Sequence, residues 1–406
     1  MCLAMAPLAS TWVICDLRDL GASGDGVTSD DAALSRALAC VGADEEGGTL
    51  VVPAGTYLLS PFVLMSNLDL HLSSEDSVLL ADSSLMLEWP LVPAYPSYDP
   101  GADGLRLAAF IGGSDITNTT IRGPGVIDGQ GEDWWHVEGL SYGRPRLIEP
   151  MFCSHFTMSG VTVRNPPFWA MHPYACEHVV FENIVFSAPL DSPNTDGIDP
   201  DSCSHVLIKN LTVVGCGDDA IAIKSGKDEW GRAFNMPSHD IVVDGGYIGP
   251  SSGIDLGSEM SGGVYNVLIS NVYFHHTLFA TRIKSGRGRG GYVRNVTHSD
   301  LVLDAVPMGI AINMHYAHET NITSPMADST PHVYDLLYRR ISGTAVNAGA
   351  LLCLPEAPCR GVVLEDINID ARVGAFECVH VKGKTSGYVT PDMHCLEPED
   401  ADESGK

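Results

Sequence analysis

The chain has 406 residues, of which 45% are hydrophobic, and a formal net charge of −28 with histidine neutral. This apolar content is sufficient for a sizeable core. The large negative charge argues against nucleic acid or an anionic membrane surface as a partner. No apolar run approaches the roughly 18 residues of a membrane span. Residues 1–15 are mildly apolar but contain no basic residue, so we do not interpret them as a signal peptide.

The first predicted element is a short helix near the N-terminus. Residues 16–31 are rich in glycine and aspartate and predict a series of turns. Ser29 follows these turns and is placed to cap a helix. The apolar face of that helix would consist of Ala33, Leu34, Ala37, Leu38 and Val41. Such a helix would cover the end of a repeat structure, which otherwise exposes its core.

A loose repeat extends over most of the remaining chain. Each copy has two short apolar strands separated by a polar pair, as in residues 156–165, 178–187, 205–214 and 266–275. The copies recur at roughly 20–35 residues, which is a solenoid period. Alternating apolar residues in short strands predict an all-β fold, a single right-handed parallel β-helix. The alternative is a β-propeller, although no blade signature is evident.

No linker divides the chain into separate domains. We therefore expect one β-helix domain over residues 1–395. Residues 396–406 are dominated by acidic residues, and this composition predicts a disordered tail.

The chain contains eleven cysteines, which is an odd number. Three pairs are close in the sequence: Cys203 with Cys216, Cys353 with Cys359, and Cys378 with Cys395. Either disulfides or buried thiols fit this spacing, because spacing does not fix connectivity. No CxxC pair occurs, so the cysteines do not indicate a zinc site.

Two acidic segments flank one predicted strand. Residues 194–199 read Asn-Thr-Asp-Gly-Ile-Asp, and residues 217–219 read Gly-Asp-Asp. If successive strands stack in parallel, Asp196 and the pair Asp218–Asp219 lie on one face, one coil apart. Grouped carboxylates can supply the proton donor and the water-activating base of glycoside hydrolysis. The alternative is that both segments are only turns, since Asn, Asp and Gly favour turns.

Four segments, in order, resemble motifs of the polygalacturonases, glycoside hydrolase family 28, in their exo-acting and plant-type form. They are residues 194–203, 217–219, 257–263 and 282–284. The resemblance extends from about residue 16 to about residue 370. It implies inverting hydrolysis of α-1,4 bonds between galacturonic acid residues in pectic polysaccharides, by a monomer in the cell wall or another extracellular location.

The resemblance also implies roles for individual residues. Asp218 would be the general acid, and Asp196 and Asp219 would together hold the attacking water. Inversion requires a separation between acid and base of roughly 6.5–9.5 Å. No metal and no organic cofactor are implied.

The substrate of this family carries a carboxylate on every sugar, so a chain of net charge −28 must concentrate positive charge at its site. The resemblance implies substrate contacts from Asn194, Arg282, Lys284 and Tyr316. Arg282 and Lys284 alternate along one strand, so both side chains point to the same side. Lys224 is a weaker candidate for the same cleft. A solvated basic loop is the alternative interpretation.

One departure from the family and one insertion affect the functional interpretation. Ser251 stands where the family usually has a histidine, which leaves open a decayed β-helix that only binds acidic polysaccharide. Residues 225–239 resemble an insertion of exo-type and plant-type members. A loop there would close one end of the groove, and attack at chain ends would follow. A pectate lyase shares this architecture, but the acidic motifs are not those of lyases.

Overall fold

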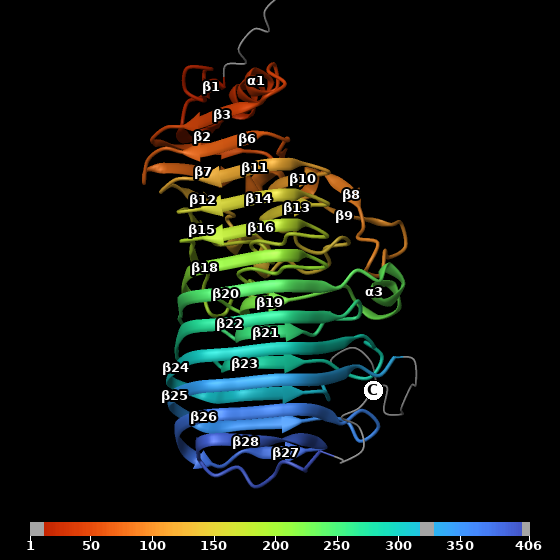
Figure 1. Cartoon of the computed structure of the whole chain (residues 1–406). Helices are drawn as coiled ribbons and strands as arrows, with labels where there is room; N and C mark the ends of the chain where they lie inside the picture. The colour runs from red at the N-terminus through yellow and green to blue at the C-terminus, as the bar shows by residue number, and fades with distance from the viewer. Residues whose placement is uncertain (1–11, 317–328, 400–406) are drawn as a thin grey trace, which may run out of the picture.

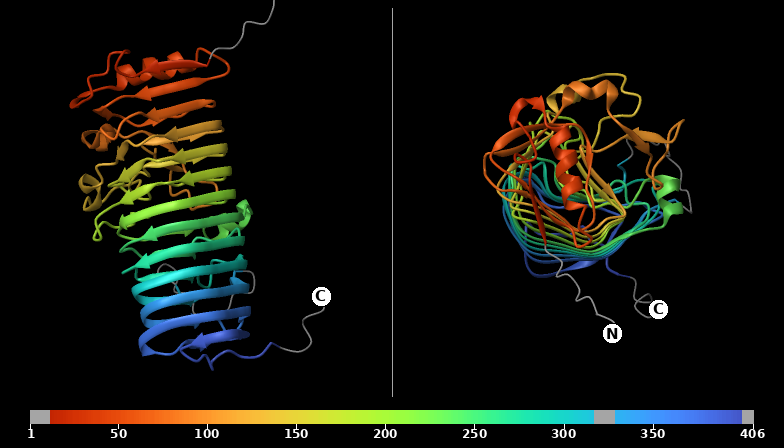
Figure 2. Two further views of the ribbon diagram at one scale, coloured as in Figure 1. Left: turned by 60° about the vertical axis from the view of Figure 1, so that its left-hand side comes forward. Right: turned by 90° about the horizontal axis from the view of Figure 1, so that it is seen from above.

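The computed structural model describes residues 12–316 and 329–399. The chain winds as a right-handed parallel β-helix, and the coils stack from α1 at one end to β28 at the other (Figure 1). Seen along the axis, the coils overlie one another around a single core, with α1 across the N-terminal end (Figure 2). The predicted all-β fold is therefore confirmed.

The N-terminal coils consist of the following elements: β1 (Val13–Asp16), β2 (Asp25–Ser29), α1 (Asp31–Val41), β3 (Gly48–Val52), β4 (Gly55–Leu59), β5 (Phe62–Val63), β6 (Leu68–Leu72), β7 (Ser77–Ala81), β10 (Ile111–Ser114), β11 (Thr117–Arg122) and β12 (Val126–Asp128). Between β7 and β10 the chain forms a 3-10 helix and an antiparallel pair of strands: η1 (Ser83–Glu88), β8 (Leu91–Pro93) and β9 (Leu105–Leu107).

The central coils carry these elements: α2 (Glu132–Trp135), β13 (Ile148–Met151), β14 (Ser154–Ser159), β15 (Thr162–Arg164), β16 (Glu177–Glu182), β17 (Val185–Ser187), β18 (Ser204–Gly215), β19 (Asp219–Ile223), α3 (Asp228–Phe234), β20 (Ser238–Ile248) and β21 (Gly253–Gly257). The C-terminal coils carry β22 (Val264–His275), β23 (Phe279–Lys284), β24 (Tyr292–Asn313), β25 (His332–Leu352), β26 (Cys359–Gly374), β27 (Glu377–Val379) and β28 (Val381–Thr390).

The repeat in the sequence corresponds to one bent side of each coil. In β18, Ile208 and Leu211 are both buried in the core, although two residues stand between them and strict alternation would place them on opposite faces. This is accommodated because Asn210 adopts a left-handed conformation with φ of +51° and turns the strand. Asn183 and Asn271 do the same in neighbouring copies. Asparagine tolerates this conformation better than most residues, which explains the recurring polar pair.

The N-terminal helix forms as predicted, but Ser29 is not its cap. Ser29 ends β2, and Asp30 occupies the N-cap position of α1. The Asp30 carboxylate accepts hydrogen bonds from the backbone N–H groups of Ser23 and Gly24, so it fixes the preceding turn. Cys15 is joined by a disulfide to Cys40 on the helix.

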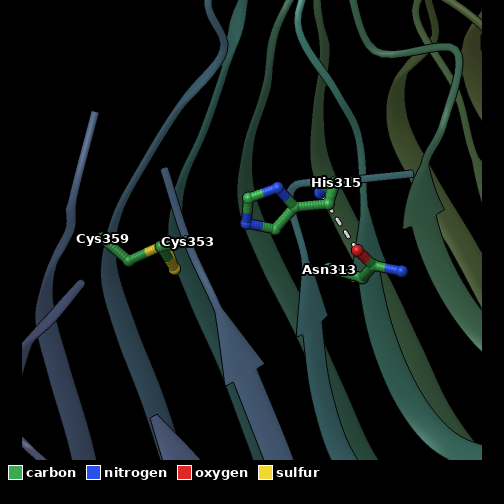
Figure 3. The surroundings of a disulfide bond; sticks show 4 residues. All are labelled: Asn313, His315, Cys353 and Cys359. Carbon is green, nitrogen blue, oxygen red and sulfur yellow. Dashed lines mark hydrogen bonds between the residues drawn. A yellow bond between two sulfur atoms is a disulfide. The ribbon is translucent and has the colours of Figure 1, made fainter. Parts of the chain in front are cut away.

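Two of the three cysteine pairs noted in the sequence form disulfides, namely Cys353–Cys359 and Cys378–Cys395. Cys203 and Cys216 do not pair: both are buried free thiols, one directly before and one directly after β18. The Cys353–Cys359 disulfide lies on the coil next to the turn that holds Asn313 and His315 (Figure 3).

The first residues of the predicted tail contact the last coil. The Glu397 backbone N–H donates to Val381, and the carbonyl of Glu397 accepts from Gly383. Residues 400–406 lie outside the described part of the chain, and the division into one domain and a disordered tail stays a prediction. No helix in the described ranges is long and apolar enough to cross a membrane.

Candidate active site

The site lies on one column of stacked positions. Ile148, Met171, Ile198, Ile221 and Ile254 are bridged in this order on successive coils. Residues at the same offset from this column therefore stack as well. Asp196 and Asp219 each precede their isoleucine by two residues, which places them one coil apart, as expected from the sequence.

The three predicted carboxylates come together. Asp196, Asp218 and Asp219 each offer an oxygen atom within 4.8 Å of the others. The side-chain amide of Asn194 donates to Asp218 at 3.3 Å. They line a pocket of about 360 Å³ together with Tyr98, Arg146, Phe168, Trp169, Lys224, Lys227, Ser258, Glu259, Lys284 and Tyr316. This volume is at the small end of the range for ligand pockets.

Arg282 and Lys284 lie on the same side of β23, as predicted, and form one buried charge cluster. Both side chains contact Asp219 and also Asp255 on the preceding coil. The Arg282 Nε donates to Asp255 at 2.8 Å, and Lys284 Nζ lies 2.9 Å from the same carboxylate oxygen. The ring of Tyr316 lies 5.7 Å from Arg282 and 5.6 Å from Lys284.

A further cation, Lys224, lies inside the same pocket and is almost fully buried. Its Nζ is 3.6 Å from Asp196, 3.9 Å from Asp199 and 3.4 Å from Glu259. It also lies 4.3 Å from the centre of the Trp169 ring, within cation–π range. The weaker sequence candidate thus lies at the centre of the acidic group.

The positive charges separate the pKa values of the neighbouring carboxyls. Burial raises the pKa of Asp218 to about 6, and the adjacent Asp219 adds to this effect. Burial also acts to raise the pKa of Asp219, but Lys284, Arg282 and Lys224 outweigh it and hold the pKa below its usual value. Such divergence is how one site obtains both an acid and a base from the same residue type.

Two further acids are buried beneath the pocket. Burial raises the pKa of Asp199 to about 7, although Lys224 and His172 oppose it, and both oxygens of Asp199 lack a hydrogen-bond partner. Burial and the charge of Asp219 raise the pKa of Asp255 to about 6. Asp199 belongs to the first acidic segment but was assigned no role of its own from the sequence, and Asp255 was not singled out there. The sequence offers one signal for Asp255: if β21 pairs in parallel with β23, Asp255 lies beside Arg282.

Ser251 does not line the acidic pocket. Its hydroxyl donates to the carbonyl of Gly249 at 3.0 Å, within its own turn. The next residue holds the acid in place, because the backbone N–H of Ser252 donates to the carbonyl of Asp218 at 2.6 Å. The segment around Ser251 therefore contacts Asp218 through a backbone hydrogen bond and not through the Ser251 side chain.

Two insertions meet at the edge of the pocket, which Tyr98 and Lys227 line. The loop between β8 and β9 carries Tyr98, whose hydroxyl donates to Asp201 at 2.5 Å. The carbonyl of Ser97 on this loop accepts from the backbone of Lys227, just before α3. The loop and α3 lie on the same side of the coil stack (Figure 1). The segment predicted to close the groove is thus joined by a second loop that the sequence did not reveal.

The basic turn after β23 is fixed by other acids. Arg287 pairs with Glu356 of the disulfide-closed loop, and Arg289 pairs with Asp228 of α3. The Arg289 Nε also donates to the carbonyl of Ser258 at 3.1 Å. Arg289 also lies 3.9 Å from Glu259 at the edge of the pocket. Arg282 and Lys284 instead contact Asp219 directly.

A parallel β-helix that presents buried carboxylates of divergent pKa defines a class of polysaccharide-cleaving enzymes. Comparison with known proteins specifies the family. The family model described as glycosyl hydrolases family 28 matches residues 52–387. The chain belongs to this family and is a glycoside hydrolase.

Individual relatives agree with this assignment. A probable polygalacturonase of Vitis vinifera is 36% identical, over 92% of this chain and 78% of its own length. An exopolygalacturonase of Zea mays is 28% identical, over 92% and 88% of the two chains. The crystal structure of a hyperthermoactive exopolygalacturonase from Thermotoga maritima superposes with a TM-score of 0.82 at 27% identity, covering 92% of this chain and 90% of that one.

The buried acids predict how stability depends on pH. A carboxyl whose folded pKa is raised contributes stability that is lost as pH rises from the unfolded pKa through the folded one. We expect the free energy of unfolding to fall between about pH 4 and pH 7, since Asp199 titrates near 7. Asp199→Asn should flatten this fall, as measured by urea unfolding across that range. Asp19→Asn, at an exposed position, is the control; equal slopes for parent and Asp199→Asn would contradict the assignment.

Proposed function

We propose that this enzyme hydrolyses α-1,4 bonds between galacturonic acid residues of pectic polysaccharides, with inversion and from a chain end. The observation that carries the proposal is the pairing of Asp218, with a raised pKa, and Asp219, with a lowered one, beside Arg282 and Lys284. The printed names of its relatives, polygalacturonase and exopolygalacturonase, support the same substrate.

In the proposed reaction, Asp218 donates its proton to the glycosidic oxygen as the bond to the anomeric carbon breaks. A water held by Asp219 and Asp196 attacks the opposite face of that carbon and gives its proton to Asp219. Asp218 suits the acid role because it retains its proton up to about pH 6. Asp219 suits the base role because three cations keep it ionised.

The spacing of the carboxylates requires a direct test of stereochemistry. The separation of 4.8 Å or less between oxygens is shorter than the roughly 6.5–9.5 Å usual for inverting enzymes. It is also close to the roughly 5–5.5 Å usual for retaining ones. Two oxygens no more than 4.8 Å apart can each accept a hydrogen bond of ordinary length from one water between them. This supports shared positioning of the water by Asp196 and Asp219.

Recognition of the substrate carboxylate is assigned to the basic strand. Arg282 and Lys284 supply directed, charged donors, Asn194 supplies an amide beside Asp218, and Tyr316 supplies a ring over the cations. Asp255 competes for the same two cations from below. Substrate binding therefore depends on how strongly Asp255 retains them.

Attack at a chain end is supported by the wall of Tyr98, Ser97 and Lys227 at the edge of the pocket. A polymer that meets this wall can place only its terminal sugar beyond the acids. We further propose an extracellular or cell-wall location, where the polymer is found and where three disulfides are stable. We expect the enzyme to act as a monomer. Binding without turnover is less well supported, because a binding module needs no separation of carboxyl pKa values.

Asp218→Asn removes the proton donor while keeping the shape of the side chain. Turnover on oligogalacturonates should fall by at least about 100-fold. In the parent enzyme, kcat/KM should fall above about pH 6, because Asp218 then loses its proton. Proton NMR of the first-formed product should show the β anomer. An α anomer would refute inversion, and absence of hydrolysis at every pH would refute the function as a whole.

Asp255→Ala and Arg282→Gln should act in opposite directions. Without Asp255, the two cations are available to substrate, and KM for galacturonate oligomers should fall by about tenfold, the equivalent of ~1.4 kcal/mol. Arg282→Gln should raise it by roughly 10–100-fold, since hydrogen bonds to charged groups contribute about 1.5–3 kcal/mol. Steady-state kinetics at pH 7, where Asp255 with its pKa of about 6 is mostly ionised, measures both effects. If both variants have the KM of the parent, the basic strand is not the carboxylate-binding site.

Product analysis tests the chain-end assignment. Early digests of long oligogalacturonates should contain saturated monomer as the only small product. Tyr98→Ala opens the wall and should release dimers and trimers as well, whereas Tyr98→Phe, which keeps the ring, should behave like the parent. Mixed oligomers from the parent enzyme would show internal cleavage, and unsaturated ends would show a lyase.

A further inference from the structure

A column of surface histidines lies on the central coils, each the second residue of its strand, in β14, β16 and β18. These strands are stacked on successive coils (Figure 1). His155, His178 and His205 occupy the same position on three successive coils, because the residues on either side of each are paired in register. All three adopt the left-handed conformation, with φ of +56° to +58°. The ring centres of His178 lie 4.8 Å from those of both His155 and His205.

The fold does not require histidine at these positions. The same column contains Asn67 and Asn118 on earlier coils, and Asp240, Asn266 and Asn295 on later ones, all left-handed. Adjacent members are linked by side-chain hydrogen bonds, as from Asn295 to Asn266 at 2.7 Å. Asparagine therefore satisfies the backbone, and the histidines must be explained by what imidazole adds.

Carboxylates flank this column on both sides. Glu177 lies 3.4 Å from Nε2 of His178, and Asp240 lies 2.7 Å from Nδ1 of His239 and 3.7 Å from Nδ1 of His205. Two sets of three side chains each offer ligand atoms within 4.8 Å of one another. The first is Glu177, His178 and His205, and the second is His205, His239 and Asp240. His205 belongs to both.

We propose that these five residues form a surface site for one zinc-class transition-metal ion, centred on His205. Ligands of tetrahedral zinc lie about 2.0–2.2 Å from the metal. The partly exposed side chains reach such positions by small rotations. Imidazole with carboxylate suits Zn²⁺, Ni²⁺ or Cu²⁺ and not Mg²⁺ or Ca²⁺, which prefer oxygen ligands alone. Because His205 is shared, the two sets bind one ion and not two.

The acidic pocket also offers three carboxylates within 4.8 Å of one another. That pocket is a poor competitor for zinc, because its ligands are all oxygen and Lys224 and Lys284 already lie among them. An ion on the histidine column would join the starts of β16, β18 and β20 across the surface. Its expected effect is on the stability of the central coils, independently of the hydrolytic function.

The test is calorimetric titration of the full-length protein with ZnCl₂ and, separately, CaCl₂. One zinc ion per chain should bind, with no calcium binding at the same site. His205→Asn should weaken zinc binding by at least about tenfold, the lower end of the effect seen when the support of a metal site is removed. Asparagine is already the residue of this column on other coils, so the variant should fold like the parent. His136→Asn, at an exposed position elsewhere, is the matched control.

A second measurement distinguishes this site from the acidic pocket. Zinc should raise the Tm of the parent and of Asp196→Asn but leave that of His205→Asn unchanged. The proposal is overturned if the parent binds no zinc at 1 mM. It is also overturned if His205→Asn binds as tightly as the parent, or if binding disappears in Asp196→Asn alone.

Discussion

The fixed register between coils is the constraint on which the other features depend. Parallel pairing requires Ile198 to lie over Ile221 and Ile221 over Ile254. Side chains from segments 20–35 residues apart are therefore brought together without any loop having to place them. A shift of one residue would turn every inward side chain outward. The buried column thus fixes the carboxylates of the site as firmly as it fixes the core.

Because the register fixes the positions of these side chains, the balance between buried acids and buried cations decides which carboxyls are protonated. Asp196, Asp199, Asp219 and Asp255 are almost fully buried, and burial of unpaired carboxylates is costly. Three buried cations, Lys224, Arg282 and Lys284, balance only some of them. The unbalanced remainder is met by protonation, which is why Asp199 and Asp218 have raised pKa values while Asp219 does not. Because of this imbalance, Asp199 and Asp218 stay protonated at mildly acidic pH.

The features that could be predicted from the sequence are those that repeat along the chain or form a recognisable motif. Apolar alternation identified the β-helix, and the two acidic motifs gave the three carboxylates and their spacing of one coil. Asp255 could not be predicted in its role, because its partners lie 27 and 29 residues away in sequence and only coil stacking joins them. The wall of Tyr98 was missed since its contact, Asp201, lies 103 residues downstream. The helix cap was predicted one residue too early, at Ser29 and not Asp30, because serine and aspartate are both good capping residues.

The absence of a histidine at Ser251 is best understood through the same charge balance. A histidine beside an acid pair can hold or share a proton, which matters where the acid itself would ionise early. Here Asp218 keeps its proton because it is buried next to an ionised Asp219, and its backbone is fixed by Ser252. Lys284 contacts Asp219 directly and so maintains the anion on which that effect depends. A buried Asp218, an ionised Asp219 and Lys284 can therefore keep the catalytic proton in place without a histidine.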